Sequence, residues 1–167
     1  GEIYKDEVDI IMCESMSSIF EGRNASRVAK EFSERVWLSW TNRGHQPDQL
    51  PSTEALSKAV DFSIEADVEC TLINCSHADM ASNSIKELKR ASRFGIFANS
   101  STFKEVDLSV ATKDVDAIHH LNSEEISAKE YAMIALSWAK EGAFVVGGCC
   151  GTTVEHTREI KLLMDSL

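Results

Sequence analysis

The feature that most constrains the fold of this chain is a regular alternation of short apolar stretches with stretches of helical spacing. The apolar stretches predict strands covered on both faces, and the spaced apolar residues between them predict amphipathic helices. The predicted strands span residues 8–13, 36–41, 70–75, 94–99 and 143–148. The predicted helices span residues 17–32, 53–66, 79–92, 127–141 and a last stretch from about residue 152. This order of βα units favours a parallel α/β sheet.

Local signals refine this pattern at the helix starts and in one connection. Ser127 followed by Glu130 has the spacing of a capping box, and Thr152 followed by Glu155 repeats that spacing. Residues 100–125 are weakly patterned and long for a loop, which is typical of a functional or mobile segment.

Length and charge exclude several classes of protein. With 167 residues the chain is long enough for one domain with a sizeable core. A formal net charge of −10, without a basic stripe, argues against binding to a nucleic acid backbone. There is no apolar run long enough to span a membrane, and the first residues do not resemble a signal peptide. We therefore expect a cytoplasmic protein.

The cysteines indicate reduced thiols rather than a disulfide framework. There are five of them, an odd number, in a chain without a recognisable secretion signal. Cys13 and Cys70 lie within strand patterns, so we expect them in the core. Cys75, Cys149 and Cys150 instead stand at strand ends.

Polar or metal-binding residues follow every predicted strand. Right-handed crossovers bring the carboxyl ends of parallel strands to one edge, where chemistry sits in such sheets and barrels. This edge receives Glu14, Asn99 and the three strand-end thiols. Glu14 is either a substrate ligand or a charge at an exposed strand mouth.

The residue types at this edge leave three interpretations of the thiols open. Three cysteines suit a catalytic zinc site, in which the protein supplies three ligands and one position stays open. The neighbouring Gly147, Gly148 and Gly151 would let the chain turn sharply enough for Cys149 and Cys150 to share one ion. The thiols also suit buried, inert side chains, or a redox-active pair of adjacent cysteines.

Several motifs, in a fixed order, carry a resemblance to a known family. They are IIMCES with Glu14, VWLSWT, LINCS with Cys75, FANSS with Asn99, and WAKEGAFVVGGCCGTT followed by EH. The last motif is the most specific. Over nearly its whole length the chain resembles the homocysteine S-methyltransferase family, whose members share a homocysteine-binding domain.

This resemblance implies a fold, a cofactor and a reaction. The implied fold is a (β/α)8 TIM barrel, and the implied cofactor is Zn2+ held by Cys75, Cys149 and Cys150. The implied enzyme is an S-methyltransferase that transfers a methyl group to the thiol of homocysteine and gives methionine. Glu14 and Asn99 are the implied substrate-binding residues, with Glu14 at the amino-acid end of homocysteine. The donor stays open among S-methylmethionine, S-adenosylmethionine, a betaine and a methylated folate.

Zinc chemistry agrees with this implication. A free thiol has a pKa of about 8.5, so little thiolate exists at neutral pH. Metal binding deprotonates the thiol and supplies the nucleophile without a general base.

The chain departs from the family pattern in three ways, one of which is that FANSS lacks the glycine that often follows Asn-Ser in relatives. Val154 stands where the family usually has proline, a residue suited to the first turn of a helix. Only five of the eight βα units are recognisable, so residues 1–167 are expected to form a partial barrel without the three N-terminal units. We expect either a piece of a longer protein or a truncated relative that dimerises, because open sheet edges need covering. The alternative functions are a non-catalytic relative that binds zinc or a partner chain, and a redox module.

Overall fold

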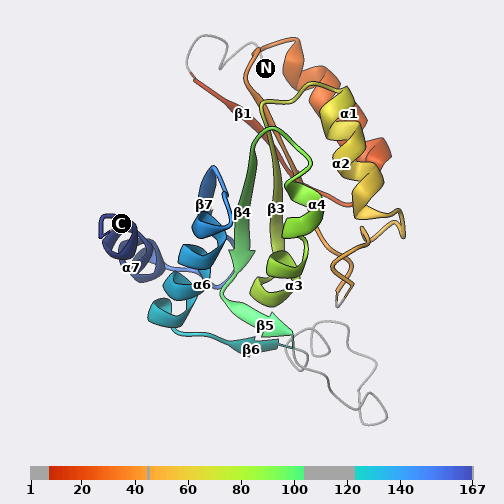
Figure 1. Ribbon diagram of the computed structural model, residues 1–167. Helices are drawn as coiled ribbons and strands as arrows, with labels where there is room; N and C mark the ends of the chain where they lie inside the picture. Colours follow the sequence, from red (N-terminus) through yellow and green to blue (C-terminus); the bar gives the residue numbers. More distant parts are fainter. Residues whose placement is uncertain (1–7, 45, 104–122, 167) are drawn as a thin grey trace, which may run out of the picture.

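The computed structural model describes residues 8–44, 46–103 and 123–166, and its backbone follows the predicted alternation of strands and helices (Figure 1). Strands β1, β2, β3, β4 and β7 form one parallel sheet in that order, which confirms the predicted parallel α/β sheet. The elements are β1 (Ile11–Met16), α1 (Ile19–Lys30), β2 (Val36–Trp40), α2 (Leu56–Glu65), β3 (Cys70–His77), α3 (Ala78–Asn83), α4 (Ile85–Leu88), β4 (Phe94–Asn99), β5 (Ser101–Phe103), β6 (Ser123–Glu125), α6 (Ala128–Lys140), β7 (Val145–Gly148) and α7 (Val154–Met164).

Helices α1, α2 and α4 lie along one side of the sheet, and α6 and α7 lie next to β7 (Figure 1). The core between β2 and its helices is centred on Trp40, which is fully buried. The indole N–H of Trp40 donates to Ser63 Oγ at 3.0 Å, and its ring stands edge-on to Phe62. A Cβ atom at Gly22 of α1 would lie 2.3 Å from this indole. Helix α1 can therefore pack closely on β2 because Gly22 carries no side chain.

The predicted helix over residues 79–92 is divided into α3 and α4 at Ser84, which corrects the single-helix prediction. The Ser84 hydroxyl lies 3.0 Å from the carbonyl oxygens of Met80 and Pro47. It also accepts a hydrogen bond from Asn42 Nδ2 at 3.2 Å. Side-chain bonds of this kind compete with the regular helical ladder, so the helix is interrupted where the loop before α2 is attached.

One of the two predicted capping boxes is confirmed and the other is wrong by one residue. Ser127 and Glu130 exchange the two hydrogen bonds of a capping box at the start of α6. At α7 the box is formed by Thr153 and His156, not by the predicted Thr152 and Glu155. The reason is that the Thr152 hydroxyl donates to the carbonyl oxygen of Cys149 at 2.7 Å and is engaged in the preceding turn.

The weakly patterned stretch 100–125 begins and ends in strands, which the sequence does not predict. Strands β5 and β6 pair antiparallel beyond the carboxyl end of β4 (Figure 1). The Phe103 N–H donates to Asp79 Oδ1 at 3.0 Å and so connects this small sheet to α3. The part of the predicted loop over residues 104–122 lies outside the described residues.

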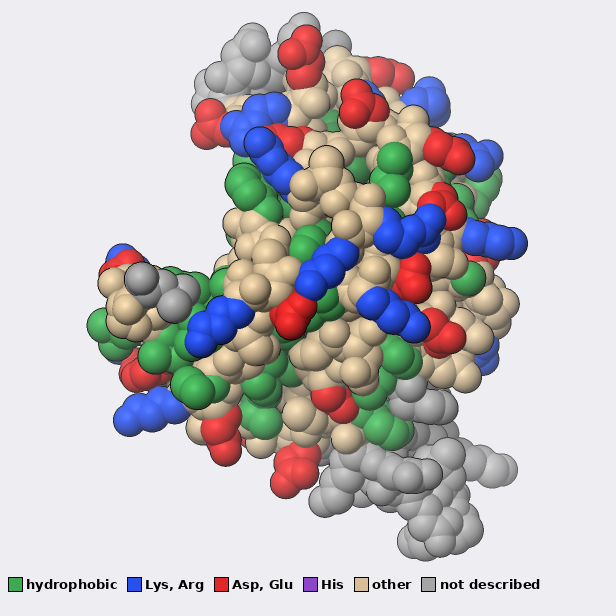
Figure 2. All heavy atoms as spheres, in the orientation of Figure 1, with side chains coloured by type: hydrophobic (Ala, Val, Ile, Leu, Met, Phe, Trp, Pro, Cys, Tyr) green, Lys and Arg blue, Asp and Glu red, His purple; other side chains and the backbone are tan. Residues whose placement is uncertain are grey.

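The surface carries mixed charges. On the face seen in Figure 2, lysine and arginine side chains are interspersed with aspartate and glutamate rather than gathered in one patch. Among the helices in the described ranges, none combines the length and apolar character that crossing a membrane requires.

Candidate metal centre

Cys75 reaches the carboxyl edge of the sheet through an irregularity in β3. Simple alternation would place Cys75 on the same face as Ile73, which is buried in the core. The register of β3 against β4 shifts between Asn74 and His77, and Cys75 has a φ of 51°. Bulges near functional sites commonly re-aim a side chain in this way. A positive φ in a residue other than glycine is also a strained conformation that concentrates at such sites.

The adjacent cysteines follow β7 in a turn whose backbone is bonded to the end of β4. The Cys149 N–H donates to the carbonyl oxygen of Ala98 at 2.8 Å, and the Cys150 N–H donates to Asn99 Oδ1 at 3.1 Å. The Cys150 carbonyl oxygen accepts from the Ser100 N–H at 3.0 Å. Hydrogen bonds within the protein thus hold the backbone of both cysteines against the end of β4.

All three glycines expected to permit this turn have identifiable structural reasons, and at Gly147 a Cβ atom would lie 2.9 Å from the Phe97 ring. Gly151 has a φ of 77°, in the left-handed region that glycine tolerates best. A Cβ atom at Gly148 would lie 2.5 Å from the Thr152 side chain. The turn therefore needs the glycines on both sides of the cysteine pair.

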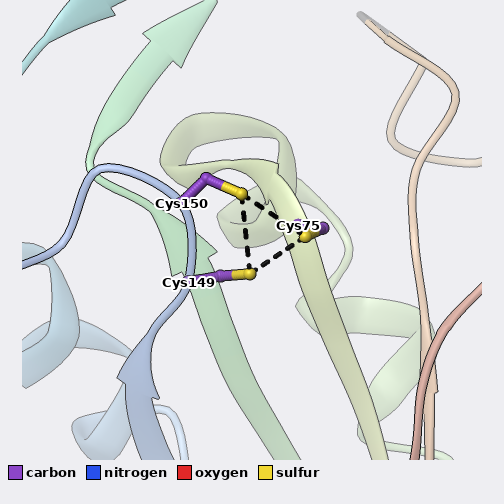
Figure 3. Close-up of side chains that lie close together, drawn as sticks. All are labelled: Cys75, Cys149 and Cys150. Atoms are coloured by element: carbon purple, nitrogen blue, oxygen red, sulfur yellow. Dashed lines mark hydrogen bonds between the residues drawn. The ribbon is translucent and has the colours of Figure 1, made fainter.

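The three strand-end thiols converge, with their sulfur atoms facing one another (Figure 3). The Sγ atom of Cys75 lies 2.9 Å from that of Cys149 and 3.7 Å from that of Cys150. The Cys149 and Cys150 sulfurs are 3.9 Å apart. All three are free thiols. Among the described residues, they are the one group of three or more metal-binding side chains whose ligand atoms lie within 4.8 Å of one another.

These distances and donor types fit zinc. Tetrahedral zinc with Zn–S bonds of about 2.3 Å separates its sulfur ligands by roughly 3.8 Å. Two of the observed separations are close to that value, at 3.7 and 3.9 Å. The Cys75–Cys149 pair, at 2.9 Å, would open by about 0.9 Å on binding. Thiolate donors favour zinc over the hard cations, which prefer oxygen ligands.

The electrostatics of the cluster also favour a cation. Burial, together with the neighbouring Cys75 thiol, raises the pKa of Cys149 to about 12. The same two causes raise the pKa of Cys150. Crowded, partly buried sulfurs resist acquiring negative charge unless a positive charge compensates it. A divalent ion between the three sulfurs would supply that compensation.

Asn74 contributes to the centre in a role that the sequence motifs alone do not reveal. It is 2% exposed, and its Oδ1 accepts from Ser39 Oγ at 2.7 Å and from the Ser15 N–H at 3.0 Å. Its Nδ2 donates to Ser15 Oγ at 2.9 Å. One buried amide therefore connects the ends of β1, β2 and β3 directly before Cys75. The available signal was a polar amide at the end of an otherwise apolar strand.

The two predicted substrate-binding residues lie in different surroundings. A pocket of about 440 Å³ adjoins the thiols, and Asn99 and Cys75 both line it, together with Arg43 and His77. Strand β1 runs to Met16, three residues past the predicted end at residue 13, so Glu14 lies within the strand, where it is exposed and does not line this pocket. The residue after Glu14, Ser15, is bonded to Asn74 beside the centre.

The remaining cysteines are part of the packing, as predicted. Cys70 is 1% exposed, and burial raises its pKa to about 12. Cys13 is partly buried and packs against the core. Burial raises the pKa of Cys13 as well, so both thiols stay protonated at neutral pH.

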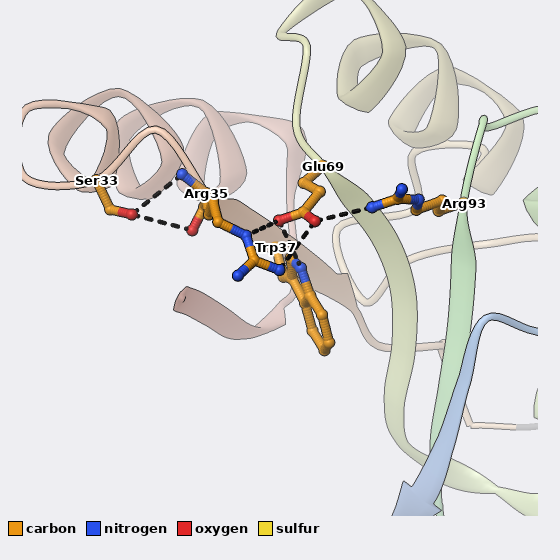
Figure 4. A network of polar contacts seen from close by, with 5 residues as sticks. All are labelled: Ser33, Arg35, Trp37, Glu69 and Arg93. Atoms are coloured by element: carbon orange, nitrogen blue, oxygen red, sulfur yellow. Dashed lines mark hydrogen bonds and ion pairs between the residues drawn. The ribbon is translucent and has the colours of Figure 1, made fainter. Parts of the chain in front are cut away.

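The opposite edge of the sheet carries ion pairs instead of thiols. Glu69 accepts from Arg35 Nε at 2.9 Å and from Arg93 Nη1 at 2.8 Å (Figure 4). The indole N–H of Trp37 donates to the same carboxylate at 3.3 Å. These contacts join β2, β3 and the start of β4 at the amino edge, where barrels carry stabilising rather than catalytic residues.

Comparison with known proteins identifies sequence relatives of this chain. The family profile described as Homocysteine S-methyltransferase matches residues 2–164. The chain is 26% identical over 162 residues to Homocysteine S-methyltransferase YbgG of Bacillus subtilis (strain 168), which covers 95% of this chain and 48% of that protein. The chain thus spans about half the length of this curated relative.

Solved structures show the same fold. The homocysteine methyltransferase MmuM from Escherichia coli, in its metallated form, gives a TM-score of 0.68 at 20% identity over 97% of this chain and 48% of that one. Its apo form gives 0.64 at 19% identity over 93% and 50%. This likeness confirms the predicted fold class, with five strands of the barrel present in the chain. Since the profile covers almost every residue, the chain belongs to the homocysteine S-methyltransferase family.

Proposed function

We propose that this chain carries the zinc-binding part of a methyltransferase that converts homocysteine to methionine. The observation that supports this most strongly is the convergence of Cys75, Cys149 and Cys150 within 4.8 Å at the carboxyl edge of the sheet. Three thiolates are the protein ligands of a zinc site that leaves one position for a substrate.

The chain's own residues would hold the ion and leave room for the substrate beside it. The three cysteines are its proposed ligands, positioned by the bulge at Cys75 and by the bonds from the Cys149–Cys150 turn to β4. When bound, zinc lowers the pKa of a coordinated thiol and so supplies a thiolate at neutral pH. The pocket next to Cys75 is open to a small amino acid, and Asn99 lines it. We propose that Asn99 and Glu14 bind the substrate.

The proposed methyl transfer balances in atoms and electrons, and it needs no general base. The thiolate sulfur of homocysteine, whose proton has passed to solvent, forms a bond with the methyl carbon while the bond from that carbon to the donor's sulfonium sulfur or ammonium nitrogen breaks. The electron pair of the broken bond stays with the donor, which leaves as a neutral sulfide or amine. Among the described residues, no carboxylate or lysine lines the adjoining pocket, and its histidine, His77, has its Nδ1 atom 2.9 Å from the Ser101 hydroxyl.

We further propose that residues 1–167 form part of a homocysteine-binding barrel domain. Strands β1 and β7 stand at the two ends of the strand order, and the matched relatives are about twice as long as this chain. A groove of about 460 Å³ beside β1 is lined by apolar side chains, including Ile11, Val28 and Phe32. The remaining strands of a barrel would cover this edge of the sheet.

Metal analysis of purified protein and cysteine variants tests the proposed site. We expect about one zinc per chain, lost in Cys75→Ser and in the double variant Cys149→Ser, Cys150→Ser. Cys13→Ser is the matched control, because this thiol packs against the core away from the cluster and should leave the zinc content unchanged. Zinc retained by the double variant would overturn the assignment.

Methyl transfer is measured next, by detecting methionine by mass spectrometry after zinc-loaded protein is incubated with homocysteine and each candidate donor in turn. Methionine formed with one donor and lost in Cys75→Ser supports the proposed activity. Stoichiometric zinc without methionine from any donor would leave the zinc assignment in place and contradict methyl transfer by the isolated chain.

A further inference from the structure

A buried phenol lies directly behind the cysteine turn. The hydroxyl oxygen of Tyr131, a residue of α6, is 2.7 Å from the carbonyl oxygen of Ala98 and 2.8 Å from that of Gly147. Tyr131 is fully buried. Because a phenol carries one hydrogen, that hydrogen is shared between the two carbonyls. The side chain therefore joins the ends of β4 and β7, the two strands that position the turn.

One of these carbonyls is also bonded to a proposed zinc ligand. The Ala98 oxygen accepts from the Cys149 N–H at 2.8 Å as well as from the Tyr131 hydroxyl. The second carbonyl, that of Gly147, lies two residues before Cys149. The phenol is thus separated from the backbone of Cys149 by a single carbonyl oxygen, and it does not line the adjoining pocket.

The phenol ring is itself fixed by packing on two sides. Trp138 stands edge-on to it at 5.7 Å between ring centroids, and the Trp138 indole N–H donates to Ser82 Oγ at 2.7 Å. His156, the capping residue of α7, also stands edge-on at 5.7 Å. The His156 Nδ1 atom accepts from the Thr153 N–H at 3.1 Å, so the imidazole is tied to the chain that leaves the cysteine turn. These aromatic contacts hold the hydroxyl in place between the carbonyls.

We propose that Tyr131 is a positioning residue of the metal centre, which holds the Cys149–Cys150 turn in register with β4 so that its thiols meet that of Cys75. The inference rests on the proposed function, because it concerns zinc binding at the same cluster. Groups that orient metal ligands from behind commonly change metal affinity by about 10- to 100-fold when they are removed. No described hydrogen bond of Tyr131 reaches the metal-binding atoms, so its effect passes through the backbone of the turn.

Tyr131→Phe isolates this role, because it removes the hydroxyl and keeps the ring. Zinc affinity is measured on the full chain by competition with a chromophoric chelator, after circular dichroism has shown that the zinc-free variant is folded. The absorption spectrum of the Co2+-substituted protein reports the geometry of the thiolate ligands. Ser63→Ala is the matched control, because it also removes a buried hydroxyl hydrogen bond, the one with Trp40, on the helical side of the sheet.

We expect the zinc dissociation constant of Tyr131→Phe to rise about 10-fold or more, with an altered Co2+ spectrum. Ser63→Ala should lose stability while keeping both the zinc affinity and the spectrum of the unsubstituted protein. Equal zinc affinity and identical spectra for Tyr131→Phe and the unsubstituted protein would overturn this inference alone. Failure of the unsubstituted protein to bind zinc would overturn the proposed metal centre, and this inference with it.

Discussion

Gly151→Ala is the substitution whose effect on the metal centre can be worked out most fully. Gly151 directly follows Cys150 and has a φ of 77°, a conformation that costs an L-residue about 1–2 kcal/mol. A Cβ atom at this position would lie 2.5 Å from Ser100 Oγ, and Ser100 is 5% exposed, so the hydroxyl must also rotate within a buried site. The substitution shifts the turn toward conformations in which the thiols lie apart, and zinc binding must then restore the strained conformation that brings them together. A penalty of about 1–2 kcal/mol corresponds to a 5- to 30-fold weaker zinc affinity.

Gly142→Ala is the matched control for this measurement. Gly142 also has a positive φ, of 98°, but it follows α6 at the far edge of the sheet, and its Cβ atom would meet nothing within 4 Å. Both variants should lose free energy of unfolding in urea, whereas chelator competition should show weaker zinc binding in Gly151→Ala alone. Equal zinc affinities for the two variants would refute the view that the backbone of this turn sets metal affinity.

Three further substitutions test the fold that supports the site. Gly22→Ala should lower the free energy of unfolding by about 1–2 kcal/mol in urea titrations, because overpacking against Trp40 outweighs the gain in helix propensity. Ser127→Ala should lose about 1 kcal/mol from the capping box. Hydrogen bonds from Ser127 lower the pKa of Glu130, so their contribution is present above the ordinary pKa of glutamate and disappears as pH falls through the lowered value. The difference between Ser127→Ala and the unsubstituted protein should therefore shrink in acid. Glu69→Gln should lower the melting temperature more at low salt than at high salt, because it removes the carboxylate shared by two arginines.

The sequence predicted those features of the fold that depend on local periodicity. The predicted apolar stretches form the strands of one parallel sheet, and the capping box of Ser127 and Glu130 lies at the start of α6. The convergence of the thiols was also predictable, because the crossover rule brings Cys75 and the Cys149–Cys150 pair to one edge without any knowledge of side-chain geometry.

Features that depend on contacts between distant residues could not be predicted in this way. The interruption at Ser84 arises from its bonds to a loop far away in sequence, and the displaced capping box at Thr153 arises because Thr152 bonds back to Cys149. The positive φ of Cys75 has no signature in composition or spacing. The spacing around Tyr131 predicts an ordinary core residue of an amphipathic helix. Its hydrogen bonds to two carbonyl oxygens depend on β4 and β7 lying side by side in the fold.

X-ray absorption at the zinc edge, recorded on the zinc-loaded chain before and after addition of homocysteine, tests the central claim most directly. We expect three sulfur neighbours at about 2.3 Å and one lighter ligand before the addition, and a fourth sulfur neighbour after it. Cys75→Ser should lose one of the three original sulfur neighbours. Fewer than three sulfur neighbours in the unsubstituted protein, or a coordination shell that homocysteine leaves unchanged, would contradict the account of an open zinc site built from Cys75, Cys149 and Cys150.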